Sequence, residues 1–374
     1  MKYMIYFILI ISNAFQATVY SQETRARARD MGIEVGIMEP GKLNSITDVP
    51  GVLVGHTTLI RGDSIRTGVT AILPYSGNIF QDKVPASIVV FNGFGKLAGY
   101  TQIKELGNIE TPIILTNTLS VPVAVNALIR YTLQQEGNEN IRSVNGVAGE
   151  TNDGFLNDIR GLHVTEEDII RAIESAHSGP IQEGSVGAGT GTRALGYKGG
   201  IGTSSRLLPL IDGKKYTIGV LVQSNFGSDL IINGIPFPEK KQQAAAVRES
   251  NSGSCMIVIA TNAPLSERNL ERLAKRAFIG MGRTTTVMSN GSGDYAIIFS
   301  TAYRIPYYTE RQTIDIPPLV SNDNMTALFR AVEEATQEAI YNSLFMATSI
   351  TGFRGHIVEA ISPDEVRKLM SKYK

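Results

Sequence analysis

The sequence predicts a layered α/β fold in a single domain. Residues 254–261 and 294–300 are apolar runs typical of buried strands, and residues 267–278 between them carry apolar side chains at helical spacing. A strand–helix–strand unit of this length packs its helix on one face of a sheet, which produces layers. The chain of 374 residues contains no internal repeat and no low-complexity linker, and it is long enough to bury a substantial core. We therefore expect one integrated α/β (α+β) domain.

The remaining segments fit the same pattern of strands and helices. In chain order we expect short strands and turns over 46–91, a strand over 111–118, a helix over 123–134, a glycine-dense stretch over 184–206, a strand over 217–224 and a polar loop over 240–252. Ser266 can cap the helix that follows it, and Gly280 can end that helix. The last helix is predicted over 325–347, with an apolar face and with Glu333 and Glu334 on the opposite face.

The first residues have the features of an export signal. Lys2 gives a positive start, residues 3–11 form an unbroken apolar run, and small residues precede a suitable cleavage point after Ser21. The apolar run is too short to span a bilayer as a permanent helix, and a buried first helix is the alternative interpretation. We predict a signal peptide over residues 1–21, export to the periplasm or to the medium, and a mature domain over residues 22–374.

Composition argues against several classes of partner and cofactor. Lys and Arg together number 35, as do Asp and Glu, so we expect no nucleic-acid partner and no membrane partner after signal removal. The single cysteine, Cys255, allows no intramolecular disulfide. The glycine-dense stretch lacks the spacing of nucleotide-binding loops, so close packing near a site explains it better. No metal and no other cofactor is expected, because the histidines are scattered: His56, His163, His177 and His356.

The junction between Gly253 and Ser254 is the first candidate for chemistry. It lies where a polar segment meets an apolar strand, in the run SGSCMIVIA. Glycine leaves the preceding carbonyl sterically open, and a serine hydroxyl there can attack that carbonyl and convert the amide into an ester. Ester formation releases the α-amine of Ser254, and hydrolysis of the ester would then restore the hydroxyl, which leaves the amine as a base beside it. Taken alone, a Gly-Ser pair before a strand is more often a simple turn.

Two polar residues at the start of a later strand form the second candidate. Ser292 and Asp294 are two positions apart, so their side chains project to the same face of a strand. The carboxylate can orient the hydroxyl and stabilise a positive charge on a nearby amine, as the third group does in sites with an activated nucleophile. The alternative interpretation is an ordinary turn that leads into a strand.

Polar residues at two other strand ends complete the set of candidates. Asn225 follows the strand predicted over 217–224 and can present an amide N–H to an oxyanion. Glu150 follows a short apolar stretch and can bind the free amine of a peptide substrate. A loop or a solvated turn is the alternative for each. Cys255 is adjacent to Ser254 but points to the opposite strand face, so we interpret it as a buried thiol and not as the nucleophile.

In this order, the motifs resemble one family: the self-processing L-aminopeptidase/D-esterase and β-aminopeptidase family of DmpA-like peptidases, P1/S58. The resemblance runs from residue 46 to residue 356, which is nearly all of the mature chain. The matching stretches are ITDVPGV, TGVTAILP, ETPIILTNTLSV, GETNDG, GSVGAGTGT, KGGIGTSSR, LVQSNFG, ATNAPL and GSGDYAIIFSTA. Chance similarity does not explain so many separated motifs in one order.

The resemblance implies both a fold and a site. Members of this family adopt a four-layer αββα sandwich that is similar to N-terminal-nucleophile hydrolases but differs in connectivity, and they assemble as tetramers or larger. By resemblance, Ser254 is the nucleophile and the first residue of a processed β chain. Ser292 and Asp294 are its supporting pair. Asn225 contributes to the oxyanion hole, and Glu150 holds the ammonium group of the substrate.

Two positions depart from the family pattern. The acidic member of the supporting pair is often glutamate in relatives, and here it is the shorter Asp294. Relatives place a tyrosine, which serves as a second oxyanion donor, two residues after the substrate-binding glutamate. Here that position is Asn152, whose amide has a different reach. The choice among α-L, β and D residues in the substrate therefore stays open at this stage.

The function implied by the resemblance is a serine aminopeptidase that acts on small peptides, amides or esters. It would be cut into an α chain of residues 22–253 and a β chain of residues 254–374, assembled as a homotetramer or larger. One alternative is an acyltransferase like the ornithine acetyltransferases, which typically place threonine after alanine at the cut. Another alternative is a non-catalytic peptide-binding protein on the same scaffold, against which the full set of candidate catalytic residues argues.

Overall fold

The computed structural model describes residues 24–227, 229–238, 252–285 and 287–373. The predicted signal peptide lies outside these residues, as does the predicted polar loop up to residue 251. None of the helices in the described ranges combines the length and the apolar character that a membrane span requires. The same ranges contain no group of three or more His, Cys, Asp and Glu side chains arranged to hold a metal ion.

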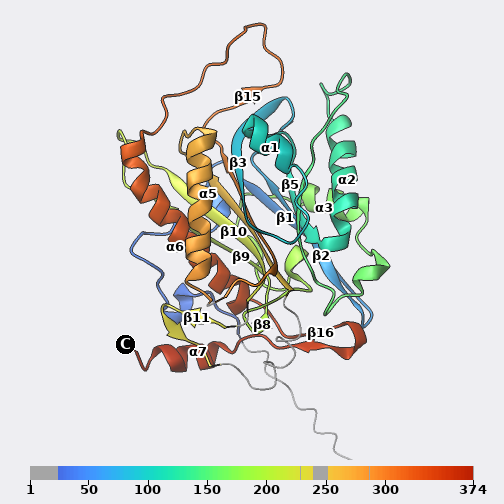
Figure 1. The fold of residues 1–374 in the computed structure, drawn as a ribbon, viewed down its shortest axis with the longest axis vertical. Helices are drawn as coiled ribbons and strands as arrows, with labels where there is room; N and C mark the ends of the chain where they lie inside the picture. The colour runs from blue at the N-terminus through green and yellow to red at the C-terminus, as the bar shows by residue number, and fades with distance from the viewer. Residues whose placement is uncertain (1–23, 228, 239–251, 286, 374) are drawn as a thin grey trace, which may run out of the picture.

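Two β-sheets stacked face to face form the centre of the molecule (Figure 1). The smaller sheet has the strand order β1-β2-β5-β6. Its strands are β1 (Leu53–Arg61), β2 (Ile65–Leu73), β5 (Ile113–Asn117) and β6 (Val147–Thr151). The larger sheet has the order β15-β3-β14-β13-β10-β9, and β4 also pairs with β3. Its strands are β3 (Asp82–Gly93), β4 (Asn108–Ile109), β9 (Ile201–Leu207), β10 (Thr217–Asn225), β13 (Ser252–Thr261), β14 (Gly291–Ser300) and β15 (Ile305–Pro306).

Helices cover the outer faces of both sheets, as Figure 1 shows. The larger sheet carries α5 (Glu267–Gly282) and α6 (Met325–Phe345), and the smaller sheet carries α2 (Val121–Leu133) and α3 (Glu166–Glu174). The αββα sandwich expected from the family resemblance is therefore confirmed. Two further helices are α1 (Tyr100–Leu106) and α7 (Pro363–Met370). Three short two-stranded sheets pair β7 (Arg193–Ala194) with β8 (Tyr197–Lys198), β11 (Ile231–Ile232) with β12 (Ile235–Pro236), and β16 (Ile350–Thr351) with β17 (Ile357–Val358).

Three apolar layers hold the sandwich together. Leu221, Met256 and Val258 belong to the layer between the two sheets. The residues that alternate with them, including Cys255 and Ile257, face α5 and α6. A third layer packs the smaller sheet against α2 and α3. Because side chains alternate between the faces of a strand and both faces are buried here, the central strands read as continuous apolar runs in the sequence.

The predicted start of α5 is confirmed, and its predicted end is wrong. The Ser266 hydroxyl accepts a hydrogen bond from the Asn269 N–H at 3.3 Å, which caps the helix. The helix then continues past Gly280 to Gly282. A Cβ on Gly280 would lie 2.4 Å from the carbonyl oxygen of Glu333 in α6. This glycine therefore lets two helices approach closely and does not form a C-cap.

The prediction that Glu334 lies on the polar face of α6 is wrong, because its side chain is buried. Nε of the fully buried Arg206 lies 3.3 Å from Glu334 Oε2, and Arg206 Nη2 lies 2.7 Å from Glu338 Oε2. Glu334 also accepts hydrogen bonds from the N–H groups of Ile37 and Met38, at 3.1 and 3.0 Å. Buried charges require partners of this kind. The partner here is a β9 arginine far away in the sequence, so the helical pattern of α6 could not reveal it.

Replacing Arg206 with methionine should destabilise the protein by about 3–5 kcal/mol, because two buried carboxylates then lose their shared cation. Urea titration measures the free energy of unfolding of each protein. Arg311→Met is the matched control, since Arg311 pairs with Asp315 at the surface and both side chains are exposed. Equal stability of the two variants would contradict the prediction.

Candidate active site

Three neighbouring strands of the larger sheet bring the predicted catalytic residues together. β10 runs antiparallel to β13, and their register pairs Asn225 with Ser254. β14 runs parallel to β13, and its register pairs Gly293 with Ser254. Asn225 ends β10, whereas Ser254 and Gly293 lie near the starts of their strands. The site is therefore built at one end of three adjacent strands.

The Ser254 hydroxyl lies against the carbonyl group that it is predicted to attack. Its Oγ donates a hydrogen bond to the Gly253 carbonyl oxygen at 2.6 Å, and the residue is buried. Side chains alternate along β13, so that of Ser254 is on the face of Met256, toward the smaller sheet. A Cβ on Gly253 would lie 3.1 Å from Phe226 Cα and 3.3 Å from the Asn225 carbonyl oxygen. The structure therefore leaves little space for a larger residue before Ser254.

Ser292 and Asp294 form the hydrogen-bonded pair that their spacing predicts. The Ser292 hydroxyl donates to Asp294 Oδ1 at 2.9 Å, and both side chains are buried. The register places Asp294 beside Cys255, on the face of the sheet that packs against α5 and α6. The prediction that Cys255 points away from Ser254 is thus confirmed. The Ser292–Asp294 pair is also on the face opposite the Ser254 side chain, so it flanks the β13 backbone next to the predicted cut.

The Asp294 carboxyl is suited to a cationic neighbour. Burial raises its pKa to about 6, and interactions with the Ser292 hydroxyl and the Cys255 N–H oppose that rise. Within the described part of the chain, Asp294 Oδ2 is buried without a hydrogen-bond partner. A positive charge beside this oxygen would stabilise the carboxylate. Burial, followed by the charge of Asp294, raises the pKa of the Cys255 thiol well above its ordinary value, which makes that thiol a poor nucleophile.

Asn225 links the larger sheet to the segment that follows β6. Its Oδ1 accepts a hydrogen bond from the Arg193 N–H at 3.0 Å, and its Nδ2 donates to the Asn152 carbonyl oxygen at 3.2 Å. The Asn152 side chain is exposed, and its Oδ1 accepts a hydrogen bond from the Gly154 N–H at 2.9 Å. Asn152 therefore contacts Asn225 through its backbone, while its side chain belongs to a turn.

Glu150 is a buried carboxylate on β6. The Lys96 N–H donates to its Oε1 at 3.0 Å, and the Thr118 hydroxyl donates to its Oε2. Burial raises the pKa of Glu150, while the Thr118 hydroxyl, the Lys96 N–H and the Lys96 charge lower it. The residue lies at the edge of the smaller sheet, where a segment after β3 pairs with β6 through Ala98 and Ala148. A carboxylate held in this way is suited to bind an ammonium group.

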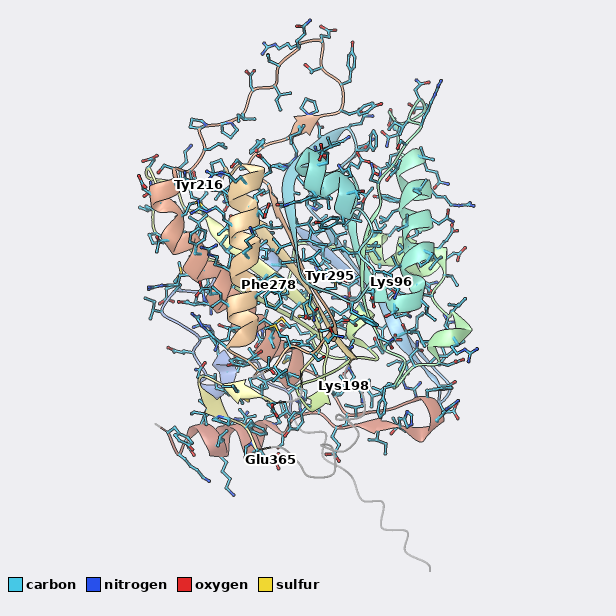
Figure 2. All side chains as sticks on the ribbon, in the orientation of Figure 1. Lys96, Lys198, Tyr216, Phe278, Tyr295 and Glu365 are labelled. Atoms are coloured by element: carbon cyan, nitrogen blue, oxygen red, sulfur yellow. The ribbon has the colours of Figure 1, made fainter. Side chains whose placement is uncertain are left out.

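Sequence reasoning did not identify the residues around Glu150. Tyr295 follows Asp294 directly on β14. The Tyr295 hydroxyl and Glu150 Oε1 each lie 2.8 Å from the position that a Cβ on Gly95 would take. Figure 2 labels Tyr295 and Lys96 near the middle of the molecule. Gly95 and Lys96 come near Glu150 only because their segment pairs with β6, which the sequence does not reveal. Tyr295 could have been suspected from the sequence, because it is adjacent to the predicted site residue Asp294.

The glycine-dense stretch packs closely against the strand that carries Asn225, in agreement with its interpretation from the sequence. A Cβ on Gly199 would lie 2.4 Å from the Ser224 carbonyl oxygen. The buried Lys198 holds the stretch together, since its Nζ donates to the carbonyl oxygens of Gly189 and Gly199 at 2.8 and 2.7 Å. Burial lowers the pKa of Lys198 to about 7. Close approach of backbone segments therefore explains the glycines here.

The chain matches the model of Peptidase family S58 over residues 44–358. It belongs to this family. It is 39% identical over 372 residues to Beta-peptidyl aminopeptidase BapA of Sphingosinicella microcystinivorans, a match that covers 93% of this chain and 92% of that protein. The family S58 protein described here is accordingly a hydrolase of the aminopeptidase class.

Two similar solved structures each cover 93% of the family S58 chain. The PH0078 protein from Pyrococcus horikoshii OT3 has a TM-score of 0.86 and 46% identity, with 99% of that chain covered. The L-aminopeptidase D-Ala-esterase/amidase from Ochrobactrum anthropi has a TM-score of 0.83 and 35% identity, with 98% covered. The latter is described as a prototype for the serine aminopeptidases and a variant of the Ntn hydrolase fold, which agrees with the αββα layers found here.

In the Ser254→Ala chain, which lacks the attacking hydroxyl and is expected to stay uncut, replacing Asp294 with asparagine should change how the stability of the protein depends on pH. In the folded protein the pKa of Asp294 is raised from 3.8 to about 6, so the stability contributed by its neutral form is complete below pH 3.8 and is lost as the pH rises through about 6. Asp294→Asn has no such loss. In urea titrations, the free energy of unfolding of the double variant relative to that of Ser254→Ala should increase between about pH 4 and about pH 7. A difference that stays constant over this range would show the prediction to be wrong.

Proposed function

We propose that the chain is a self-processing serine aminopeptidase that cuts itself between Gly253 and Ser254. The observation that carries the proposal is the 2.6 Å hydrogen bond from the Ser254 hydroxyl to the Gly253 carbonyl oxygen. The neighbouring strands β10 and β14 place Asn225 and the Ser292–Asp294 pair beside the peptide bond between Gly253 and Ser254. Membership of family S58 supports the same function.

Self-cleavage would take place in two steps. In the first, Ser254 Oγ bonds to the Gly253 carbonyl carbon, the peptide C–N bond breaks, and the hydroxyl proton passes to the leaving nitrogen. In the second, water adds to the resulting ester and restores the Ser254 hydroxyl. The products are an α chain of residues 22–253 that ends in a carboxylate and a β chain of residues 254–374 that begins with a free α-amine.

The new amine would arise close to a carboxylate. Asp294 is paired with Cys255, the second residue after the cut, and its Oδ2 is buried without a hydrogen-bond partner in the described ranges. We infer that this carboxylate stabilises the α-ammonium that forms when the Ser254 amine accepts a proton from its own hydroxyl. The 2.9 Å hydrogen bond from Ser292 orients the carboxylate for that role.

Substrate hydrolysis would use the same serine. Ser254 attacks the carbonyl of the amino-terminal residue, and water hydrolyses the acyl-enzyme. Asn225 Nδ2 stabilises the oxyanion after exchanging its hydrogen bond to the Asn152 carbonyl for one to the substrate. Glu150 binds the ammonium group of the substrate. Because an acylated amine cannot form this ion pair, free amino termini are preferred.

The proposed substrates are short peptides, amides and esters with a free amino terminus. The names of the relatives direct substrate tests toward β-linked residues, L-residues and D-alanine esters. We further propose export through residues 1–21, on the basis of the apolar run over residues 3–11. By the family resemblance, we propose assembly of the αβ units into a homotetramer or a larger homo-oligomer. The reaction requires no cofactor, since nucleophile, base and oxyanion donor all come from the chain.

Ser254→Ala should abolish self-cleavage, because the variant lacks the attacking hydroxyl. Intact mass and N-terminal sequencing should show wild type as two fragments, one of which begins Ser-Cys-Met-Ile, and Ser254→Ala as one chain. Ser266→Ala is the matched control, since that hydroxyl caps α5 and should leave cleavage complete. An uncut wild-type chain, or a cut Ser254→Ala chain, would remove the proposed function.

Glu150→Gln should lower kcat/KM for β-alanine p-nitroanilide by roughly 10- to 100-fold, because the ammonium loses a charged partner. Propionyl p-nitroanilide lacks the amine and should react equally with both proteins. Burial raises the pKa of Glu150, so amine binding by wild type should weaken as the pH falls through that raised value. Equal kcat/KM of wild type and variant for the amine substrate would rule out this role.

A further inference from the structure

Tyr295 lies beside the predicted nucleophile. It alternates with Asp294 on β14, so its side chain points to the other face, toward the smaller sheet. Gly293 is paired with Ser254, and a Cβ on Gly293 would lie 3.1 Å from Tyr295 Cε2. The tyrosine ring therefore occupies the space next to Ser254 that a side chain at position 293 would otherwise fill.

The hydroxyl end of the same ring and the carboxylate of Glu150 lie close to the same point beside Gly95. Tyr295 Oη and Glu150 Oε1 each lie 2.8 Å from the position that a Cβ on Gly95 would take. Any other residue at position 95 would collide with both groups, so the glycine keeps them facing one small volume. In the part of the chain that the structure describes, no hydrogen bond uses the Tyr295 hydroxyl. The phenol therefore has unused capacity to bind a polar group beside Glu150.

The electrostatic surroundings of Tyr295 favour a cation. Burial, followed by the charges of Glu150 and Asp294, raises the pKa of Tyr295 to about 12. The phenol is therefore neutral, and its oxygen can accept a hydrogen bond from an N–H donor. The same negative charges that oppose ionisation of the phenol stabilise an ammonium group at this place.

We propose that the Tyr295 hydroxyl is a second ligand for the ammonium group of the substrate, together with Glu150, and that the tyrosine ring sets the spacing between that group and Ser254. This inference rests on the proposed aminopeptidase function and deepens it. The ammonium donates one hydrogen bond to Glu150 Oε1 and another to Tyr295 Oη. The ring edge forms the wall between this ammonium and the Ser254 hydroxyl. Tyr295 is thus a substrate-binding residue, and no bond is made or broken at it.

Tyr295→Phe tests the proposal, because it keeps the ring and removes the oxygen alone. We expect kcat/KM for β-alanine p-nitroanilide to fall roughly tenfold, mainly through KM, with self-cleavage still complete by intact mass. Propionyl p-nitroanilide, which lacks the amine, should react as with wild type. Tyr303→Phe is the matched control, since the Tyr303 hydroxyl donates to the Leu265 carbonyl at 3.1 Å, and it should change neither rate. An equal effect of Tyr295→Phe on both anilides, or no effect on either, would overturn the proposal.

A binding measurement tests the same inference without turnover. Titration of n-propylamine into wild type and Tyr295→Phe should give a Kd roughly tenfold higher for the variant, and equal Kd values would overturn the proposal. A wild-type chain that neither cuts itself nor hydrolyses the amine substrate would remove the proposed aminopeptidase function. The propylamine titration would still decide whether Tyr295 binds an ammonium group.

Discussion

The register of β13 between β10 and β14 is the constraint on which the site depends. On one side of β13, Ser254 lies opposite Asn225 of β10. On the other side, Cys255 lies opposite Asp294 of β14. Because side chains alternate, a slip of one residue would turn the Ser254 hydroxyl toward α5 and α6 and the Cys255 thiol toward the smaller sheet. The residues that follow, such as Met256 and Ile257, are fully buried on opposite faces, so such a slip is disfavoured.

Buried carboxylates serve two different purposes in this fold. Glu334 and Glu338 are paired with Arg206 inside the chain, so their charges are compensated and they join α6 to β9. Glu150 and Asp294 accept hydrogen bonds, but within the described ranges neither forms an ion pair at 4.0 Å or less. Burial raises the pKa of both carboxyls, and the interactions around each of them oppose that rise only in part. An ammonium group, from Ser254 or from a substrate, would supply the missing positive charge.

Errors in the sequence interpretation occurred where one residue type serves several structural roles. Gly280 follows an apolar stripe and has the pattern of a helix end, yet the close approach of α6 requires glycine there. Glu334 has the spacing of a solvent-facing residue, yet it pairs with a buried arginine. Helical spacing describes local structure, whereas the outcomes at Gly280 and Glu334 depend on partners far away in the sequence.

The sequence by itself determined the layered α/β class, the strand–helix–strand unit, and the same-face pair of Ser292 and Asp294, because periods of 2 and 3.6 residues follow from local backbone geometry. Ordered motifs then indicated the family and pointed to Ser254. The tertiary structure alone decided that Asn225 is paired with Ser254 and that the Tyr295 hydroxyl and Glu150 both lie beside Gly95. Strand order, register and the stacking of two sheets are long-range contacts, and no local pattern specifies which distant segments meet.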